Sequence, residues 1–245
     1  MLTAVVLSHN EDAHLSRCLS SLKFADQLLV IDDSSTDDTR AVAASFSARV
    51  VSHPLNSNFS AQRNFALSQI RSGWVLFVDA DEVVSSPLRF AITSAVGKLG
   101  INGYFIPRED FLWGRALTHG DNRVELLRLA RKGSGHWFGK VHESWLIRGP
   151  VGRLSFPLLH YPHPTVAEFV SHIDRYSTIR AGELHHESVR VNIFSVILFP
   201  LGKFLHLYLI KLGFLDGMPG LISALMMSFY SFLVRAKLYL LYRHV

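Results

Sequence analysis

Acidic and amide side chains follow three separate apolar runs in the first 85 residues of the chain. In the stretch VLFVDADE, four apolar residues lead directly into Asp79, Asp81 and Glu82. Because burying an unpaired carboxylate is costly, these acids must reach water, a cation or hydrogen-bond donors. Two earlier apolar runs end in the same way, in residues 8–11 (SHNE) and 32–37 (DDSSTD).

Asp79 and Asp81 have the spacing of a cation site. Two carboxylates one residue apart beyond a strand can bind a hard divalent cation, and Mg²⁺ usually takes one or two carboxylates together with phosphate oxygens of a substrate. The glycine-rich phosphate loops of dinucleotide folds and P-loops are missing. We therefore expect these acids to hold a metal that bridges to a diphosphate, helped by a side chain such as Arg63.

The elements that must position these acids alternate between strand and helix over residues 1–110. Strands are predicted by apolar, β-rich runs and helices by apolar residues at helical spacing; the strands are 2–8, 27–33, 49–53 and 74–81, and the helices 11–23, 36–46, 60–71 and 87–99. Such alternation predicts a parallel sheet, whose right-handed crossovers place all the strand ends on one ligand-binding edge. The alternative is helix capping, by Asn10 for the first helix and residues 34–37 for the second.

The rest of the chain changes character twice. Residues 104–107, 124–131 and 136–141 are strand candidates joined by glycine-rich loops, and residues 165–189 predict one long polar helix opened by Pro164. After Asn192 the sequence is strongly apolar. We therefore expect three segments, 1–110, 111–190 and 191–245.

Composition limits the classes of partner. The 245 residues carry a formal net charge of +5, and the mean hydropathy is +0.21. A basic and apolar chain suggests binding to a membrane surface. Nucleic-acid binding would predict a cluster of Lys and Arg residues, and the sequence contains no such cluster. Cys18 is the sole cysteine, which excludes an intrachain disulfide and favours a reducing compartment. The N-terminal run lacks a basic leader, so we do not expect a signal peptide.

Four motifs in this order, VVLSHNEDAHLSRCLSSL, LLVIDDSSTDDT, SAQRNFAL and WVLFVDADE, resemble the nucleotide-sugar half of family 2 inverting glycosyltransferases, which have a GT-A fold. The resemblance implies a Rossmann-like α/β domain with a mostly parallel sheet, a nucleoside-diphosphate sugar donor, by default linked to uridine, and Mg²⁺ or Mn²⁺. It also implies site residues. Ser8, Asn10 and Glu11 would line the nucleotide pocket, Asp32 or Asp33 would meet the base or ribose, Arg63 and Asn64 would face the nucleotide, and Asp79 and Asp81 would serve the ribose and the metal–diphosphate, with Asp81 on the metal.

The second half is similar to a bacterial subgroup that includes transferases adding glucose to the heptose of the lipopolysaccharide inner core. The similarity lies in GRALTHG, in VELLRLARKGSGHWFGKVHESWLIRGPVGRL, in LLHYPHPTVAEFVSHIDRYS and in GFLDG. Members often carry an aromatic-Pro-Asp segment after His119-Gly120, where this chain has residues 121–123 (DNR). Residues 111–190 would thus form the acceptor half of the domain.

Glu143 lies where this family keeps a conserved acid. In an inverting transfer the acceptor hydroxyl attacks the anomeric carbon while a carboxylate removes its proton, so Glu143 is the candidate base. The alternative is a solvated glutamate in a surface loop. His142 would orient Glu143, contact the acceptor or be structural, and Arg128 or Arg131 would approach phosphate or lie on a solvated face.

The apolar tail is too interrupted to predict a spanning helix, which needs roughly 20 apolar residues. The run after residue 193 meets Pro200, Gly202 and Lys203, and the run from residue 221 reaches only 234 before Arg235. We expect helices that lie in the membrane interface with their cations at the headgroups. The alternative is a helical pair packed on the catalytic domain or in a dimer.

The sequence thus predicts a peripheral enzyme at the cytoplasmic face of the bacterial inner membrane. It would transfer a hexose, by resemblance glucose, to a lipopolysaccharide core or another lipid-linked glycan. Alternatives are a transferase acting on polyprenyl phosphate, a catalytically inactive module that binds nucleotide sugar and membrane, and a nucleotidyltransferase.

Overall fold

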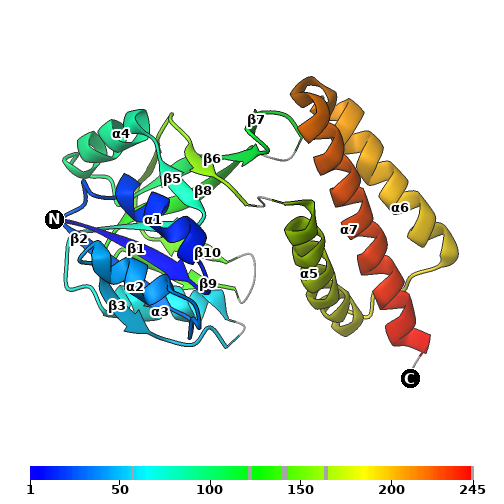
Figure 1. Cartoon of the computed structure of the whole chain (residues 1–245), viewed down its shortest axis with the longest axis horizontal. Coiled ribbons are helices and arrows are strands. Elements are labelled where there is room, and N and C mark those ends of the chain that lie inside the picture. Colours follow the sequence, from blue (N-terminus) through cyan, green and yellow to red (C-terminus); the bar gives the residue numbers. More distant parts are fainter. Residues whose placement is uncertain (57, 121–122, 140–142, 163–164, 244–245) are drawn as a thin grey trace. The chain divides into compact units, whose positions relative to one another are not determined.

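The computed structural model describes residues 1–56, 58–120, 123–139, 143–162 and 165–243 (Figure 1). The chain forms two compact units. The first contains Met1–Arg108 and Val124–His160, and the second contains Glu109–Arg123 and Tyr161–Val245. This division differs from the three segments expected from composition, because residues 124–160 return to the first unit.

The first unit is built on a mixed sheet whose strands are ordered β3-β2-β1-β4-β8-β6-β12-β5, with β11 paired to β6. The pairs β1–β2, β1–β4 and β2–β3 are parallel, whereas β4–β8 and β12–β5 are antiparallel. The strands are β1 Leu2–Ser8, β2 Gln27–Asp32, β3 Arg49–Ser52, β4 Trp74–Asp79, β5 Glu82–Val84, β6 Gly103–Leu112, β8 Arg123–Arg131, β11 Val151–Arg153 and β12 Leu158–His160. The α/β class expected from the sequence is confirmed.

Helices cover both faces of this sheet because its central strands are apolar on both sides. Alternate residues of β1 point to opposite faces, so Ala4 packs with α1, α2 and α4, whereas Val5 packs with α3. Cys18 of α1 is fully buried in the first of these cores, as expected. The helices are α1 Asp12–Ser21, α2 Thr39–Ser45, α3 Phe59–Ser68 and α4 Ser86–Val96.

A two-stranded ribbon lies on the α3 side of the sheet. It consists of β9 Gly135–Phe138 and β10 Ser144–Ile147, in which Trp137 pairs with Trp145. The two indole rings stack with centroids 5.2 Å apart, and both meet the edge of Phe77 from β4. Aromatic pairs in these geometries add to the stability gained from burial alone, so the ribbon is fixed to the central strand.

The second unit is mainly helical. The end of β6 pairs with β7 Arg115–Leu117, and α7 Gly217–Arg243 packs against both α5 Val166–His186 and α6 Ile193–Leu205 (Figure 1). A π-helical turn, His206–Ile210, extends α6, and a 3₁₀ turn, Gly213–Asp216, precedes α7. The long helix expected at 165–189 is present, and Thr165 caps it by accepting from the Glu168 N–H.

The two tail helices are longer than the sequence indicated. Ile193–Ile210 and Gly213–Arg243 are each long and apolar enough to cross a membrane by length and composition, a test that buried helices of soluble proteins also pass. Our expectation of runs too short to span was wrong, because Pro200 lies within α6 and Arg235 and Lys237 lie within α7 without ending either helix. Lys237 is accommodated by contacts to α5, including a 2.6 Å contact with Asp174.

Candidate functional site

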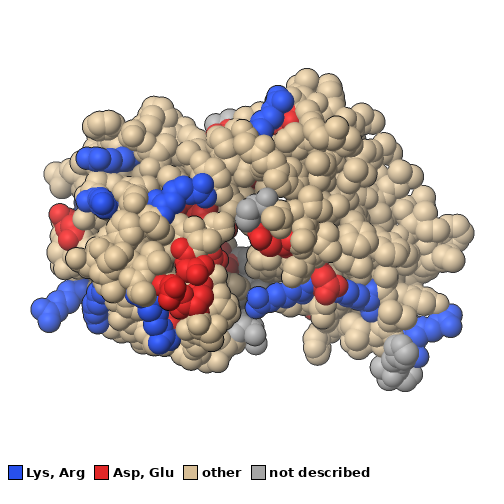
Figure 2. All heavy atoms as spheres, in the orientation of Figure 1, with Lys and Arg blue, Asp and Glu red and all other residues tan. Residues whose placement is uncertain are grey.

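The three polar strand ends lie along one edge of the sheet, as the parallel topology requires. Ser8 at the end of β1 is in register with Asp32 of β2, and the neighbouring Leu7 is in register with Asp79 of β4. Acidic side chains gather on a face of this unit (Figure 2). In open α/β sheets, ligands bind at this carboxyl edge.

The loops after β1 and β2 are joined by hydrogen bonds. The Asn10 side chain accepts from the Thr36 N–H at 2.8 Å, and Thr39 Oγ1 accepts from the Glu11 N–H at 2.7 Å. Asn10 does not cap α1, whose N-cap residue is Glu11, so that alternative is wrong. Asp37 does serve a capping role, since its carboxylate accepts from the N–H groups of Asp12 and Thr39.

The two aspartates at the end of β2 have different surroundings. Asp32 is fully buried, and Arg40 donates to it at 2.6 Å. Asp33 is partly exposed, and it accepts from the Leu55 N–H at 2.8 Å. Of the two, Asp33 is therefore the one a ligand can reach. The nearby Ser8 hydroxyl is buried and has no hydrogen-bond partner among the described residues.

Asp79 lies between two buried arginines. Arg63 donates to its Oδ1 at 2.9 Å and Arg128 to its Oδ2 at 2.6 Å, and these arginines are only 3% and 6% exposed. Burial alone would raise the pKa of Asp79, but the charges of Arg128 and Arg63 outweigh it and hold that pKa well below its usual range. The same contacts raise the pKa of Arg128 against the effect of its burial. Both Asp79 oxygens are therefore occupied by guanidinium groups.

Arg63 also connects this edge to Glu143. Its Nε donates to Glu143 Oε1 at 2.9 Å, so one guanidinium bridges two carboxylates that are distant in the sequence. Its guanidinium also lies over the Trp137 ring, 4.7 Å from the centroid. Glu143 is 15% exposed, which removes the alternative of a fully solvated loop glutamate.

Asn64 holds the ribbon that carries these aromatic residues. Its amide donates to the Trp137 carbonyl and accepts from the Trp137 N–H, each at 2.9 Å. We expected Arg63 and Asn64 to face the nucleotide, but the structure engages both side chains with protein groups. The physical reason is the packing of β9 against α3, a long-range contact that no local pattern indicates.

Asp81 pairs with a histidine that the sequence did not single out. His160 Nε2 lies 3.1 Å from Asp81 Oδ2, because β12 runs antiparallel to β5 and pairs His160 with Glu82. Burial raises the pKa of Asp81, but the contact with His160 lowers it by more, so the net pKa lies below its usual value. Glu82 is fully buried, and burial raises its pKa while its carboxylate accepts from the Asp79 N–H.

Glu11 is the remaining acid at this edge with a perturbed pKa. Burial and the negative charges of Asp81, Asp37, Asp79 and Asp12 together raise its pKa to about 7. A carboxyl with this pKa is half ionised at neutral pH. A bound cation would therefore favour its ionised form.

Asp81 and His160 fit a divalent cation that is completed by a substrate. A carboxylate oxygen and an imidazole nitrogen are ligands for Mn²⁺, and Mg²⁺ accepts the carboxylate. The described residues contain no cluster of three or more His, Cys, Asp or Glu side chains that could hold a metal. The further ligands would thus have to be diphosphate oxygens and water, which is the usual arrangement for Mg²⁺ in phosphate-binding sites.

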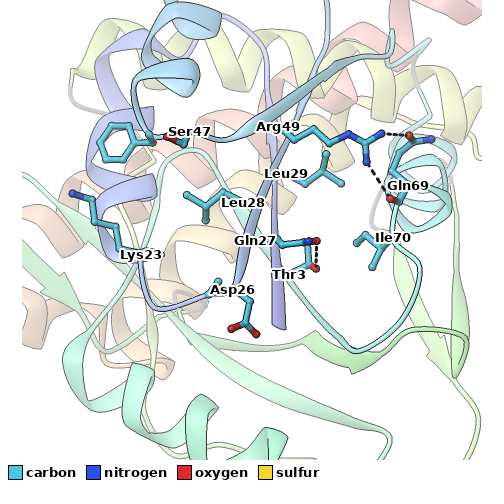
Figure 3. A pocket seen from close by; sticks show the side chains of 12 residues that line it. Thr3, Lys23, Asp26, Gln27, Leu28, Leu29, Ser47, Arg49, Gln69 and Ile70 are labelled. Carbon is cyan, nitrogen blue, oxygen red and sulfur yellow. Dashed lines mark hydrogen bonds between the residues drawn. The ribbon is translucent and has the colours of Figure 1, made fainter. Parts of the chain in front are cut away.

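A pocket of about 470 Å³ opens at the opposite end of the same strands, lined by residues such as Thr3, Gln27 and Arg49 (Figure 3). Arg49 donates there to the Gln69 side chain at 2.9 Å. This hollow contains none of the residues predicted for the site. We place the site at the carboxyl edge because the converging acids and arginines lie there.

Two residues of this network illustrate what the sequence could and could not show. Arg128 was considered as a phosphate contact or a surface residue, and the alternation of its strand indicated one buried face. His160 had only a weak signal, a short apolar pair that ends in a histidine. His142, which was considered beside Glu143, lies outside the described residues, as do residues 121–122.

Known proteins resemble the chain in sequence and in fold. The family model "Glycosyl transferase family 2" matches residues 3–91. The lipopolysaccharide core biosynthesis glycosyltransferase LpsC of Rhizobium meliloti is 30% identical over 97% of this chain and 92% of its own length. An uncharacterized glycosyltransferase of Rickettsia typhi is 25% identical over 97% of this chain and 86% of its own.

The crystal structure of S. aureus TarS residues 1–349 in complex with UDP-GlcNAc matches 99% of this chain and 91% of that one, with a TM-score of 0.51 and 13% identity. That likeness supports the fold, in agreement with the GT-A-type architecture expected from the sequence. The 30% identity to LpsC, which extends over nearly the full length of both chains, supports the family and the enzyme class. The chain belongs to glycosyltransferase family 2.

Proposed function

We propose that this enzyme transfers a hexose, with glucose as the first choice, from a nucleoside-diphosphate sugar to a lipopolysaccharide core or another lipid-linked glycan, with inversion. The observation that carries the proposal is the bridge Asp79–Arg63–Glu143, which ties the donor edge of the sheet to a carboxylate in the second half of the sequence. The acceptor class is suggested by the identity to LpsC, whose name assigns it to lipopolysaccharide core biosynthesis.

The donor would occupy the carboxyl edge of the sheet. Ser8, Asn10 and Glu11 would line the nucleotide, and Asp33 would meet the base or ribose, since Asp32 is buried against Arg40. Arg63, Asn64 and Asp79 would act by fixing the shape of the site rather than by direct contact. A uridine nucleotide is the first donor to test, because the TarS structure with a similar fold holds UDP-GlcNAc.

Asp81 and His160 would hold the divalent cation, Mg²⁺ or Mn²⁺. When bound, the cation would offset the negative charge that develops on the departing diphosphate. His160 Nε2 and Asp81 Oδ2 lie 3.1 Å apart, so both can face one ion.

Glu143 would be the base. The acceptor hydroxyl oxygen forms a bond to the anomeric carbon as the bond from that carbon to the diphosphate oxygen breaks, and Glu143 takes the hydroxyl proton. Arg63 occupies Glu143 Oε1, which leaves Oε2 as the atom that receives the proton. Arg63 thereby fixes the carboxylate of Glu143 in one orientation.

The tail, residues 191–245, would associate the enzyme with the cytoplasmic face of the inner membrane, where a lipid-linked acceptor is found. The long apolar helices α6 and α7 support this role, and charged side chains are sparse on their visible surface (Figure 2). Residues 111–190 would contribute the acceptor half.

A donor screen tests the proposal. The full chain in neutral detergent is titrated with uridine, guanosine and thymidine diphosphate sugars by calorimetry, with Mn²⁺ or Mg²⁺ and then with chelator. We expect one donor to bind in a metal-dependent way, and His160→Gln to weaken that binding at least tenfold. Metal-independent binding would refute the cation site, and binding of no donor would refute the transferase proposal. If product formed only with polyprenyl phosphate as the acceptor, that acceptor would replace the lipid-linked glycan in the proposal.

A further inference from the structure

A hollow of about 490 Å³ opens between the two tail helices. Both walls belong to the second unit. It is lined by Leu198, Phe199, Gly202, Lys203 and His206 of the α6 side and by Ser231 and Arg235 of α7. The α6 residues recur at three- to four-residue spacing, so they share one helix face.

The lining of the hollow combines large apolar side chains with nitrogen donors. Leu198 and Phe199 are 57% and 55% exposed, although both are large and hydrophobic. Lys203, His206 and Arg235 supply the cationic or hydrogen-bonding groups. An anionic group with an attached hydrocarbon chain would match both kinds of side chain.

The tail provides few acids to neutralise these cations. Residues 193–245 contain five Lys or Arg and a single acid, Asp216. Asp216 is buried and already accepts from the main chain and side chains of Thr118 and His119. Among the tail cations, Lys237 is held by Asp174. The residues that line the hollow include Lys203 and Arg235 and no acid, so its lining carries a net positive charge.

Arg235 is a cation of this lining without a carboxylate partner among the described residues. Within the described part of the chain its guanidinium donates to the Ser231 carbonyl and hydroxyl, at 3.3 and 3.2 Å, and it lies 3.9 Å from the Phe199 ring centroid. No carboxylate pairs with it there. Stacking on Phe199 fixes the planar group. Because both bonds to Ser231 use Nη1, Nε and Nη2 of Arg235 are left to engage an oxyanion, as arginine does when it binds phosphate.

We propose that this hollow binds the phosphate of an anionic membrane lipid, with Arg235, Lys203 and His206 around the phosphate and Leu198 and Phe199 against the acyl chain. Basic pockets between membrane helices bind lipid headgroups by the same chemistry. This inference rests on the proposed membrane association of the tail. It adds a defined headgroup site to a face that would otherwise bind by apolar insertion alone.

Gly202 allows a test that leaves the charge unchanged. A Cβ at Gly202 would meet nothing within 4 Å, so Gly202→Leu can place its side chain in the hollow without a backbone clash. Gly182 of α5 also has open space around its Cβ, so Gly182→Leu is the matched control outside the hollow. Arg235→Gln removes the cation itself.

The measurement is flotation of the full chain with vesicles of phosphatidylcholine alone and of phosphatidylcholine mixed with phosphatidylglycerol. We expect the wild type to prefer the anionic vesicles, Arg235→Gln to lose about fivefold of that preference, and Gly202→Leu to lose a similar part while Gly182→Leu keeps it. A far-UV circular dichroism spectrum equal to that of the wild type shows that each variant is folded.

The outcomes separate the two proposals. Equal binding of the wild type to both vesicles would overturn the headgroup site and leave the membrane role intact. A loss in Arg235→Gln without a loss in Gly202→Leu would also overturn it, because charge would then act without the hollow. Failure to float with either vesicle would reject the membrane role together with the site.

Discussion

The carboxyl edge of the sheet and the apolar tail treat charge in opposite ways. At the edge, Arg63 and Arg128 are almost fully buried and are paired with Asp79 and Glu143. In the tail, Arg235 lies beside exposed apolar side chains and has no carboxylate partner among the described residues. The comparison suggests that the edge is organised before a ligand arrives, whereas the tail still needs an anion from outside the chain.

The sharpest way to test the first half of this comparison is Glu143→Gln. The amide keeps an oxygen for the Arg63 Nε but cannot take a proton, so donor binding should stay while kcat falls by about 10²–10⁴-fold. Steady-state rates and donor calorimetry measure the two effects. Glu125→Gln is the control, because Glu125 is 48% exposed and pairs only with Arg153 on the surface in the described structure. Wild-type turnover by Glu143→Gln would eliminate Glu143 as the base.

Asp79→Asn tests whether the edge depends on its internal pairing. The substitution leaves two nearly buried guanidinium groups without their shared carboxylate, so we expect a loss of about 3–5 kcal/mol in the free energy of unfolding. Urea denaturation measures the change. Asp38→Asn, at an exposed position with no side-chain capping bond, should change stability by less than about 0.5 kcal/mol. Equal stability of the two variants would mean that the arginines are solvated.

Lys237→Met tests the tail cation that the protein does neutralise. The Lys237 ammonium lies 2.6 Å from the Asp174 carboxylate and 2.9 Å from the Ser177 hydroxyl. Removing it should lower the stability of the α5–α7 packing by about 1–2 kcal/mol, seen as a lower Tm in neutral detergent. Lys98→Met, on the surface of the first unit, is the control. An unchanged Tm in Lys237→Met would mean that the pairing of Lys237 with Asp174 does not stabilise the tail, and Lys237 would then not differ from Arg235 in this respect.

Glu11 gives an effect of another kind, one that depends on pH. Its pKa is raised from 4.5 to about 7, so the folded protein holds a proton that the unfolded chain has lost between those values. The contribution of Glu11 to stability is therefore fully present below pH 4.5 and is lost as pH rises to about 7. Glu11→Gln should become more stable relative to the wild type across this window.

The same titration predicts that divalent cations bind the wild type more tightly as pH rises toward 8, because Glu11 then becomes ionised without metal. Calorimetry of Mn²⁺ in buffers of different ionisation enthalpy would detect the released proton near pH 7. If the stability difference between the wild type and Glu11→Gln did not depend on pH, the pKa of Glu11 would not be raised. Asp38→Asn, at an exposed position whose charge is not among those that raise the pKa of Glu11, is the control.

The sequence predicted the sheet well because its signals are local. The apolar runs of β1, β2 and β4 and the polar residues that follow each of them give the strand ends directly, and the parallel topology aligns them. By contrast, the pairing of Asp81 with His160 spans 79 positions in the chain. It depends on β12 returning beside β5, which no local periodicity encodes.

The tail shows the other limit of local patterns. Apolar runs were ended at Lys203 and Arg235 because a charge within an apolar stretch reads as a boundary. The helices continue through both residues, since a helix needs only backbone hydrogen bonds and a face on which the charge is tolerated. The contact between Asn64 and the main chain of Trp137 was not predicted for a similar reason, because the two residues lie 73 positions apart.

The clamp that α3 places on the β9–β10 ribbon has a consequence for how such enzymes diversify. Asn64 bonds to the main chain of the ribbon and Arg63 to Glu143, the residue before β10, so an exchange of this segment between relatives would require a compatible α3 as well. Chimaeras cut between residues 68 and 74 would separate the two partners. The segments that would have to be exchanged together are therefore interleaved along the chain and do not correspond to its first and second halves.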